Sequence, residues 1–342
     1  MTSGGAPESG FRRLRAAQSG KDITTRIEAA TLDELPEGEV TVRVEYSSIN
    51  YKDALSATGS PGVTRTYPHI PGIDAAGTVL ASRVAAFRPG DPVIAGGGDF
   101  GALSPGGYSQ IIRLPAERLT LLPEGLSPRT AMVFGTAGFT AALCVKAVLD
   151  HGKRGGGALV TGASGGVGSF AVWMLARNGF SVTAVTGKKG AAHYLRELGA
   201  REVIGREEAI DSNARPLLSG RWDAVIDSVG GPMLATALRS CKPGAVAAIC
   251  GNAASPELSL TVYPFILRGI TLCGIDAPSI VADARRRIWE QLAAEQQPEV
   301  LERIAVECTL DELPSWIPRV LHGEVTGRVV VRVADEPSQD AR

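Results

Sequence analysis

Cysteine is scarce in this chain, and no two cysteines are spaced as a C-x-x-C pair. The five are Cys144, Cys241, Cys250, Cys273 and Cys308. Because the cysteines are scattered, we expect neither a disulfide framework nor a cysteine-rich zinc lobe. The scatter fits a reducing compartment. The first residues also lack the basic and then apolar pattern of a secretory signal peptide. We therefore expect a cytoplasmic protein.

An excess of charge of either sign is also missing. The chain has 342 residues, with 35 Lys and Arg against 36 Asp and Glu, so its formal net charge is −1. This balance does not favour nucleic acid or an anionic membrane surface as a partner. A hydrophobic content of 44% with 21% charged residues is typical of a globular chain, and the length predicts about two domains.

One long stretch without charge, residues 155–176, has the length of a membrane span. Its first half is a glycine-rich turn that carries Thr161 and Ser164, and lipid offers no hydrogen-bond partners for such an irregular backbone. We therefore expect no membrane partner. A transmembrane helix is the competing interpretation of this stretch.

The first third of the chain predicts a β-rich domain. Val40–Tyr46 alternates with the period of a half-buried strand. Two short apolar runs, Gly77–Ala81 and Asp91–Ala95, lie between turns that contain Pro and Gly. Short strands separated by such turns indicate a compact, barrel-like domain.

After residue 127, strands and helices alternate. The expected strands are Ala158–Thr161, Ser181–Thr186, Glu202–Ile204, Asp223–Asp227, Ala245–Cys250 and Ile270–Ile275, with a closing strand at Arg328–Val333. The expected helices are Thr130–Leu149, Gly166–Asn178, Gly190–Leu198, Met233–Ser240 and Ala282–Ala294. This order predicts an α/β fold in which a doubly wound, parallel Rossmann sheet accompanies the β-rich domain.

The most informative segment is ALVTGASGGVGSF, Ala158–Phe170, a strand followed by a glycine-rich turn and a helix. Glycine lets the backbone approach a pyrophosphate, and the N–H groups at the helix start face the anion. We expect a dinucleotide to contact Gly162, Ser164, Gly165, Gly166, Val167, Gly168 and Ser169. A tight turn without a ligand is the alternative.

The tip of the next strand indicates which dinucleotide binds. An NAD site would place an Asp or Glu about 20 residues after the glycine fingerprint. This chain has Thr186, Gly187, Lys188 and Lys189 there, and a hydroxyl with two ammonium groups suits a 2′-phosphate. We expect NADPH as the cofactor, with Tyr194 and Arg201 as further candidates for the same phosphate. A solvated lysine pair would leave the choice open.

Together, the β-rich first domain, the TGASGGVGS turn and the closing strand resemble the medium-chain dehydrogenase/reductase superfamily. The strings SSINYKD (Ser47–Asp53), PHIPGIDAAGTV (Pro68–Val79), GTAGFTA (Gly135–Ala141) and YPFILRGITLCGID (Tyr263–Asp276) are similar to its acryloyl-CoA reductase group, which includes YhdH-type quinone oxidoreductases. This resemblance covers residues 11–333. It implies a GroES-like catalytic domain of residues 1–126 and 279–342 and a Rossmann NADPH-binding domain of residues 127–278.

Zinc-dependent members of that superfamily bind the catalytic metal through Cys, His and Glu or Asp. The matching places here are Asn50, the pair Ile73 and Asp74, and the helix start near Val133. One carboxylate cannot form a three-ligand zinc site, and residues 95–110 contain no cysteine for a structural zinc. The resemblance therefore implies the zinc-free branch, which disfavours alcohol dehydrogenation because no Lewis acid would stabilise an alkoxide.

The resemblance implies reduction of the conjugated C=C bond of a 2-enoyl-CoA, with acryloyl-CoA reduced to propanoyl-CoA. Charge develops on the thioester oxygen, so a hydrogen-bond donor must face it, and the α-carbon then takes a proton. Tyr51, in a loop implied to line the nicotinamide cleft, is the first candidate for donor or acid; an aromatic lid on the nicotinamide is the alternative. Asn50 is expected to orient the carboxamide or substrate, or to serve only in a turn.

Some of the remaining candidate residues are expected to contact the cofactor or the substrate, and the others are expected to have structural roles. Gly251 and Asn252 follow a parallel strand and are expected near the nicotinamide-side ribose. The resemblance implies that Arg328 reaches the cofactor pyrophosphate. Arg65 is a candidate for a coenzyme A phosphate, with a solvated arginine as the alternative. We expect a structural or solvated pair for Lys52 and Asp53, a loop role for His69, and for Asp74 a bond to backbone or a neighbouring side chain. We expect a buried thiol rather than a nucleophile for Cys250, and a solvated helix face for Arg285, Arg286 and Arg287.

Two other functions stay open. One is a quinone oxidoreductase with the same fold and cofactor, and the other is a non-catalytic NADPH-binding protein. The glycine turn is common to all three, so it does not distinguish them. The resemblance also implies a homodimer that pairs Ile270–Ile275 across a two-fold axis.

Overall fold

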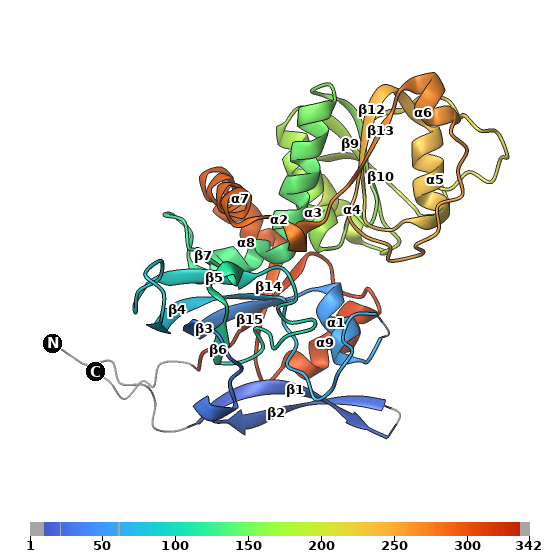
Figure 1. The fold of residues 1–342 in the computed structure, drawn as a ribbon. Coiled ribbons are helices and arrows are strands. Elements are labelled where there is room, and N and C mark those ends of the chain that lie inside the picture. The colour runs from blue at the N-terminus through green and yellow to red at the C-terminus, as the bar shows by residue number, and fades with distance from the viewer. Residues whose placement is uncertain (1–9, 21, 61, 336–342) are drawn as a thin grey trace. The chain divides into compact units, whose positions relative to one another are not determined.

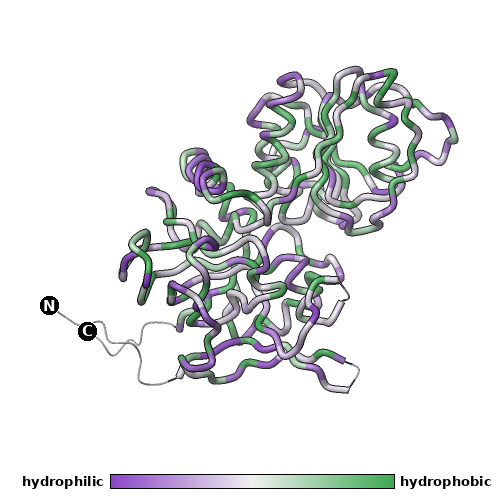
Figure 2. The backbone as a smooth tube through the Cα atoms, in the orientation of Figure 1, coloured by the Kyte–Doolittle hydropathy of each residue, from purple (hydrophilic) through white to green (hydrophobic). Residues whose placement is uncertain are grey.

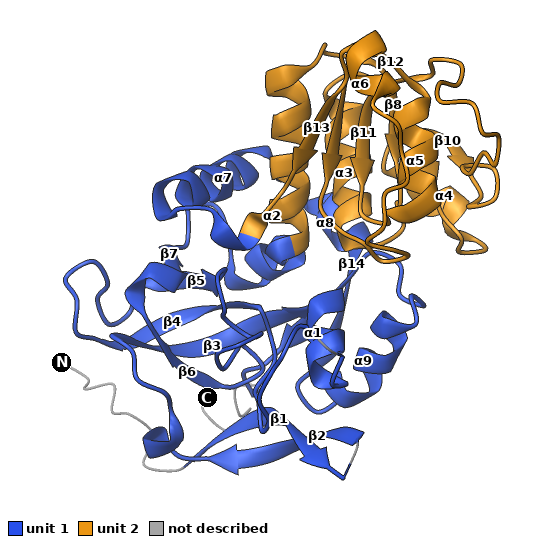
Figure 3. Ribbon diagram, turned by 45° about the vertical axis from the view of Figure 1, so that its right-hand side comes forward, with its two compact units in different colours: residues 1–136, 278–342 blue, residues 137–277 orange. Residues whose placement is uncertain are grey.

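The computed structural model describes residues 10–20, 22–60 and 62–335, which divide into two compact units (Figure 1, Figure 3). Unit 1 consists of residues 1–136 and 278–342, and unit 2 of residues 137–277. The first division falls inside the helix α2 (Pro128–His151), whereas the sequence placed it after residue 126.

Unit 1 is built on a seven-stranded sheet with the order β14-β15-β3-β4-β5-β7, with β6 paired to β3. Its strands are β3 (Val40–Ile49), β4 (Asp74–Ser82), β5 (Pro92–Gly96), β6 (Ile111–Leu114), β7 (Leu119–Leu121), β14 (Ala305–Thr309) and β15 (Arg328–Arg332). The alternation predicted for Val40–Tyr46 is confirmed, because Val40, Val42 and Val44 point into the core of this unit. The closing strand lies beside β3 in antiparallel register, so the C-terminal segment completes the first domain.

Further elements of unit 1 surround this sheet. They are the hairpin β1 (Phe11–Ser19) and β2 (Asp22–Ala30), the helices α1 (Tyr51–Ala57), α7 (Ala282–Glu295), α8 (Pro298–Ile304) and α9 (Leu313–Leu321), and the 3-10 turns η1 (Leu32–Glu34) and η2 (Ala116–Arg118). A third such turn, η3 (Ala277–Ser279), lies where the chain passes between the units. The expectation of a loop at Tyr51 is wrong, because Asn50 begins a helix there with a capping box to Asp53.

Unit 2 is a six-stranded sheet in which every neighbouring pair is parallel. Its strands are β8 (Gly156–Val160), β9 (Phe180–Val185), β10 (Ala200–Ile204), β11 (Trp222–Asp227), β12 (Cys241–Ile249) and β13 (Thr271–Gly274), and its helices are α3 (Gly166–Arg177), α4 (Ala191–Glu197), α5 (Gly231–Arg239) and α6 (Tyr263–Arg268). The order β10-β9-β8-β11-β12-β13 is the doubly wound order of dinucleotide-binding sheets. The predicted α/β class is therefore confirmed, and Figure 2 shows that these strands are largely hydrophobic.

The helix α2 is long and apolar, and it is the one helix in the described part of the chain with the length and composition of a membrane span. Of its most apolar window, 72% is buried inside the protein, as is typical of a core helix. Its backbone breaks at Gly135, with φ 49° and ψ −158°. The uncharged stretch 155–176 instead forms β8, the glycine turn and most of α3.

Candidate functional site

The glycine turn between β8 and α3 has a geometry that only glycine permits. Gly162 has a φ of +57°, in the left-handed region. A Cβ atom on Gly168 would lie 2.4 Å from the carbonyl oxygen of Gly162, so the first turn of α3 packs directly on the backbone before it. The Gly165 N–H donates to the Gly162 carbonyl at 2.9 Å, which closes the turn just before the helix. This glycine-lined turn at the start of α3 fits the close approach of a pyrophosphate.

The carboxyl ends of β8 and β11 are joined by a buried carboxylate that the sequence analysis missed. The Thr161 hydroxyl donates to Asp227 Oδ1 at 2.6 Å, and the Gly230 N–H donates to Asp227 Oδ2 at 2.8 Å. Burial raises the pKa of Asp227 above its usual value. The sequence signal that could have identified Asp227 is its place at the end of an apolar strand, shortly before Val229-Gly230-Gly231. Asp227 therefore shapes the edge of the sheet that carries the glycine turn.

Gly251 lies at this same edge, after β12. A Cβ atom on it would be 2.7 Å from the carbonyl oxygen of Ser228, so the chain segments that follow β11 and β12 approach each other closely. Asn252 is exposed beside them. The thiol of Cys250 is half-buried and donates to the Asp227 carbonyl at 3.4 Å, which agrees with the structural role expected for it.

The tip of β9 lies against the glycine turn. The hydroxyl groups of Ser164 and Thr186 are 2.7 Å apart, and Lys188 Nζ donates to the Ser164 carbonyl at 3.4 Å. The pKa of Lys188 is lowered, first by its burial and then by the positive charge of Arg206. Arg206 was not singled out from the sequence, because it follows β10 and only the parallel pairing brings it to β9.

Tyr194 is engaged with α3. Its hydroxyl donates to the Ser169 hydroxyl at 2.8 Å. Burial raises the pKa of Tyr194 to about 12, although this hydrogen bond opposes the shift. Tyr194 thus braces the first turn of α3, and Arg201 is exposed on β10.

Unit 1 contains a buried group of polar side chains that we call the ionic cluster: Ser48, Asn50, Asp53, Asp74 and Arg328. The guanidinium of Arg328 donates to the Asn50 side-chain oxygen at 2.8 Å and to the Ser48 hydroxyl at 2.6 Å. Its Nη2 lies 3.6 Å from Asp74 Oδ2. Asp74 Oδ2 accepts from Ser48 at 2.7 Å and from Asn50 Nδ2 at 2.8 Å. The structural role expected for Asp74 is confirmed.

Asp53 adds a second carboxylate to the ionic cluster. It accepts the Asn50 N–H at 2.8 Å and the Ile73 N–H at 2.8 Å. Burial, together with the negative charge of Asp74, raises the pKa of Asp53 to about 6. Asp53 thereby links the start of α1 to the segment that precedes β4. Of the two roles expected for it, the structural one holds, because Asp53 is buried while Lys52 is exposed.

The break in α2 is packed against the same cluster. A Cβ atom on Gly135 would lie 2.5 Å from Arg328 Nη2 and 2.6 Å from Asp74 Oδ2. The Thr136 N–H donates to Asp74 Oδ2 at 2.9 Å, and the Thr136 hydroxyl donates to Asp74 Oδ1 at 2.6 Å. Asp74 therefore caps the second segment of α2 where the helix restarts.

Tyr51 is the first residue of α1, and its side chain is 45% exposed. The preceding Asn50 is 9% exposed and uses both ends of its amide inside the ionic cluster, since Nδ2 donates to Asp53 and Asp74 and Oδ1 accepts from Arg328. Lys52 is exposed. Tyr51 is therefore accessible, whereas the Asn50 amide is used inside the ionic cluster.

The places that the resemblance matches to zinc ligands surround Arg328 in this protein. Its Nε donates to the Val133 carbonyl at 3.3 Å, and its other nitrogens face Asn50 and Asp74. A guanidinium among these groups does not fit a zinc ion, because its positive charge repels a cation. Of the places matched to zinc ligands, Asp74 alone supplies a carboxylate. Among the described residues, no group of three His, Cys, Asp or Glu side chains is arranged to hold a metal ion.

Arg65 is exposed on the loop that follows α1. This loop is anchored at two points, since the Thr64 hydroxyl donates to the Ala102 carbonyl at 2.8 Å and the Tyr67 hydroxyl donates to the Ser56 carbonyl at 2.5 Å. His69 is buried with its ring against the Gly101 carbonyl, as expected for a loop role.

The solvated helix face expected for Arg285 is wrong. Its guanidinium is buried and donates to the carbonyl groups of Gly96, Pro278 and Ile280, each at 3.1 Å. The neighbours Arg286 and Arg287 are exposed, as expected. The helix α7 thus points Arg285 inward, toward three backbone carbonyl groups.

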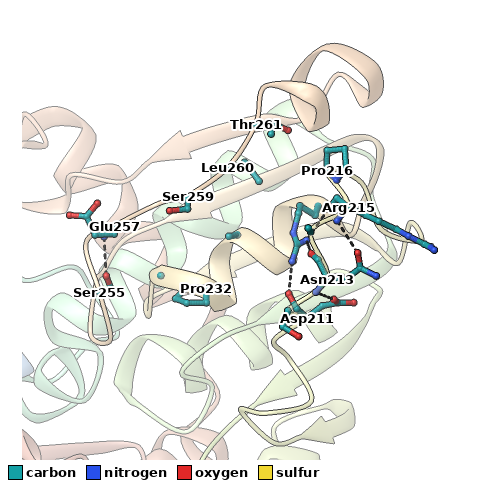
Figure 4. A pocket seen from close by; sticks show the side chains of 15 residues that line it. Asp211, Asn213, Arg215, Pro216, Pro232, Ser255, Glu257, Ser259, Leu260 and Thr261 are labelled. Atoms are coloured by element: carbon teal, nitrogen blue, oxygen red, sulfur yellow. Dashed lines mark hydrogen bonds between the residues drawn. The ribbon is translucent and has the colours of Figure 1, made fainter.

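A pocket of about 650 Å³ lies along α5 in unit 2 (Figure 4). Its wall on one side is the loop from Asp211 to Pro216, which Arg239 holds by donating to the carbonyl groups of Asp211 and Arg215 at 2.6 and 2.9 Å. None of the residues singled out from the sequence lines it. We assign it no part in the proposed chemistry.

The fold and these two sets of residues define a dehydrogenase with a GroES-like part and a dinucleotide-binding part. The family description "Alcohol dehydrogenase GroES-like domain" matches residues 36–124, and "Zinc-binding dehydrogenase" matches residues 166–295.

Full-length relatives narrow this class. The acrylyl-CoA reductase AcuI of Ruegeria pomeroyi is 46% identical over 92% of this chain and 96% of its own. The provisionally named quinone oxidoreductase YhfP of Bacillus subtilis is 41% identical over 94% of this chain and 99% of its own. Its crystal structure with NAD has a TM-score of 0.91 at 40% identity and covers 95% of this chain and 100% of that one.

A solved structure agrees with this assignment. The yhdH oxidoreductase of Salmonella enterica in complex with NADP has a TM-score of 0.92 at 40% identity and covers 94% of this chain and 100% of that one. The chain therefore belongs to the medium-chain dehydrogenase/reductase superfamily, in the group that includes AcuI, YhdH and YhfP.

Proposed function

We propose that this protein reduces the C=C bond of a 2-enoyl-CoA thioester with NADPH, and that acryloyl-CoA is converted to propanoyl-CoA. The observation that carries the proposal is the exposed phenol of Tyr51, held at the start of α1 by the capping box of Asn50 and Asp53. The similarity to AcuI over nearly the whole of both chains supports the same substrate class.

The glycine turn would hold the cofactor through the N–H groups of residues 164–169, with Gly251 and Asn252 nearer the nicotinamide end. Thr186, Gly187, Lys188 and Tyr194 would lie toward the adenosine ribose. NADPH, when bound, supplies the hydride.

Tyr51 supplies the hydrogen bond that the reaction requires on unit 1. Its phenol donates to the thioester oxygen as negative charge develops there. It can also donate a proton to the α-carbon, directly or through water. Asn50 acts as a positioning residue, because its amide groups are used to fix the start of α1 and so the direction of the phenol.

Two arginines have separate roles in the proposal. Arg65 meets a phosphate of coenzyme A from its anchored loop, since a guanidinium binds phosphate through parallel hydrogen bonds. Arg328 holds Asn50 and Asp74, and its expected contact with the cofactor pyrophosphate stays a prediction.

Quinone reduction is the second candidate function, because the name of YhfP points to it and its chain matches this one over its full length. Following NADPH absorbance with acryloyl-CoA, crotonyl-CoA and a benzoquinone in parallel separates the candidates. Turnover of the thioesters supports the proposal, turnover of the quinone alone supports the second candidate, and tight NADPH binding without turnover indicates a non-catalytic protein.

The Tyr51→Phe variant tests the role of the phenol. Loss of one oxyanion donor typically costs about 100- to 1,000-fold in kcat, whereas NADPH affinity should stay within a factor of about two. Lys52→Ala, the next and exposed residue of α1, is the control and should retain kcat. Unchanged kcat in Tyr51→Phe would remove Tyr51 from the reaction.

We further propose a cytoplasmic homodimer that pairs β13. This strand is the last in its sheet. The segment that precedes it exposes Val262, directly before α6, and Ile266 and Leu267 within α6, with exposed fractions of 65, 67 and 62%. An exposed strand edge next to an apolar patch favours pairing with a second copy. A monomeric mass by light scattering at micromolar concentration would contradict this arrangement.

A further inference from the structure

Arg206 lies across the backbone of the segment that follows β9. It comes two residues after β10, which pairs in parallel with β9 through Val185 and Ile204. The Thr186 N–H donates to the Ile204 carbonyl at 3.1 Å, which holds the two strand ends together. A Cβ atom on Gly187 would be 2.4 Å from Arg206 Nε and 2.8 Å from Cζ. The guanidinium therefore occupies the space that a side chain at position 187 would need.

Two positive groups meet at this point. The guanidinium of Arg206 lies over Gly187, the residue directly before Lys188. Its positive charge adds to burial in lowering the pKa of Lys188. Glu207 and Glu208 follow Arg206, but within residues 10–335 as described no carboxylate forms an ion pair with its guanidinium. A pair of neighbouring cations is stabilised by an anion placed between them.

The hydroxyl groups beside these cations are already positioned. Ser164 and Thr186 lie 2.7 Å apart, and Thr186 also accepts the Lys188 N–H at 3.1 Å. The Lys188 ammonium reaches the Ser164 carbonyl in the glycine turn. Hydroxyls, an ammonium and a guanidinium thus gather at the ribose end of the expected dinucleotide.

We propose that Arg206 is the residue that determines the preference of this protein for NADPH, by binding the ribose 2′-phosphate together with Lys188 and Thr186. This inference rests on the proposed function only in that a dinucleotide occupies the glycine turn. A phosphate monoester carries close to two negative charges near neutral pH, which offsets the repulsion between Arg206 and Lys188. A guanidinium also offers two parallel donors to phosphate oxygens.

Adenosine 2′,5′-bisphosphate and adenosine 5′-monophosphate isolate this contact, because they differ only in the 2′-phosphate. Binding of each to the full chain is measured by calorimetry at a fixed salt concentration, so that the readout does not depend on turnover. Arg206→Ala should weaken binding of the bisphosphate about tenfold or more and change binding of the monophosphate less than about twofold. Arg196→Ala, an exposed arginine on α4, is the charge-matched control and should change neither.

Gly187→Ala is a second variant that keeps every charge. The φ of Gly187 is not in the left-handed region, so alanine is tolerated there, but its Cβ displaces the guanidinium of Arg206. It should weaken binding of the bisphosphate several-fold without lowering the melting temperature. This result separates the position of Arg206 from the total charge of the surface.

Three outcomes overturn the inference. Equal losses for both nucleotides in Arg206→Ala would place the arginine on the adenine or the 5′-phosphate. Retention of the wild-type preference in Arg206→Ala would assign the 2′-phosphate to other residues. If the wild-type protein binds the bisphosphate and the monophosphate equally, no 2′-phosphate contact exists. The proposed function fails separately, if the wild-type protein binds neither NADPH nor NADH.

Discussion

The ionic cluster of unit 1 and the glycine turn of unit 2 use polar groups in opposite ways. In the ionic cluster, Arg328, Asp74 and Asn50 are buried and satisfy one another. At the glycine turn, the backbone carries the binding features, and the cations at the tip of β9 are half-buried or exposed. The charged groups of the ionic cluster are therefore used to fix the structure of unit 1, whereas the donors at the glycine turn are available to a ligand.

The strongest test of this contrast removes Arg328. The Arg328→Ala variant leaves the buried carboxylates of Asp53 and Asp74 without their cation, and breaking a buried pair in this way costs about 3–5 kcal/mol. Urea unfolding, followed by a probe for each unit, measures the loss. Arg43→Ala, an exposed arginine on β3, is the control and should cost less than about 0.5 kcal/mol. Equal losses in the two variants would contradict a structural role for the cluster.

The next largest effect concerns the pH dependence of unit 1. The pKa of Asp53 is raised from 3.8 to about 6 in the folded protein, so between these values the folded chain binds more protons than the unfolded chain. The contribution of Asp53 to the free energy of unfolding is therefore present below about pH 4 and is lost as the pH rises through about 6, by up to about 3 kcal/mol. Urea unfolding between pH 4 and 7 measures this slope.

The Asp53→Asn variant is the comparison for that slope. Its side chain does not titrate, so the free energy of unfolding should depend less on pH over the same range. Parallel pH profiles for the wild-type protein and Asp53→Asn would show that this carboxyl does not titrate there.

A smaller effect is expected at the glycine turn, where shape rather than charge is tested. Gly168→Ala places a Cβ atom 2.4 Å from the Gly162 carbonyl oxygen, and such overpacking costs about 1–3 kcal/mol. It should also reduce NADPH affinity, because α3 must move away from the turn. Gly205→Ala, which has open space around its Cβ position, is the control. Unchanged melting temperature and affinity in Gly168→Ala would refute the close packing.

The smallest effect comes from an exposed ion pair in unit 2. Lys146 and Asp150 lie one turn apart on α2, 2.7 Å from each other, with 53% and 48% of their side chains exposed. Water and salt screen such a pair, so Lys146→Ala should cost about 0.3–0.5 kcal/mol. The melting temperature at low and high salt measures it. A loss comparable to that of Arg328→Ala would remove the distinction between buried and exposed charges.

Local patterns in the sequence were reliable where one element contains all the information. The glycine turn between β8 and α3, the alternation in β3 and the absence of a carboxylate after β9 are readable from consecutive residues. Tyr51 was expected in a loop but begins a helix. The cap that starts this helix is recognised only once the Asp53 side chain accepts the Asn50 N–H. The role of the phenol in the reaction stays a prediction.

The residues that sequence reasoning missed depend on distant partners. Arg206 reaches Gly187 only because β10 pairs with β9, and Asp227 meets Thr161 only because β11 pairs with β8. The sequence predicts Arg285 as one member of a solvated run of arginines. In the structure, its side chain points from α7 into the protein and donates to the Gly96 carbonyl. No local spacing encodes these contacts.

The amino-acid order alone determined the class of fold, the place of the dinucleotide turn and the preference for positive charge after β9, because hydrophobic period, glycine spacing and side-chain charge act over a few consecutive residues. Only the tertiary structure decided that Asn50 is a buried positioning residue, that Arg328 lies among the places matched to zinc ligands, and that Arg206 joins Lys188. Those outcomes depend on which strands and helices pair across hundreds of residues, and the desolvation and mutual contacts of buried polar groups exist only after that pairing.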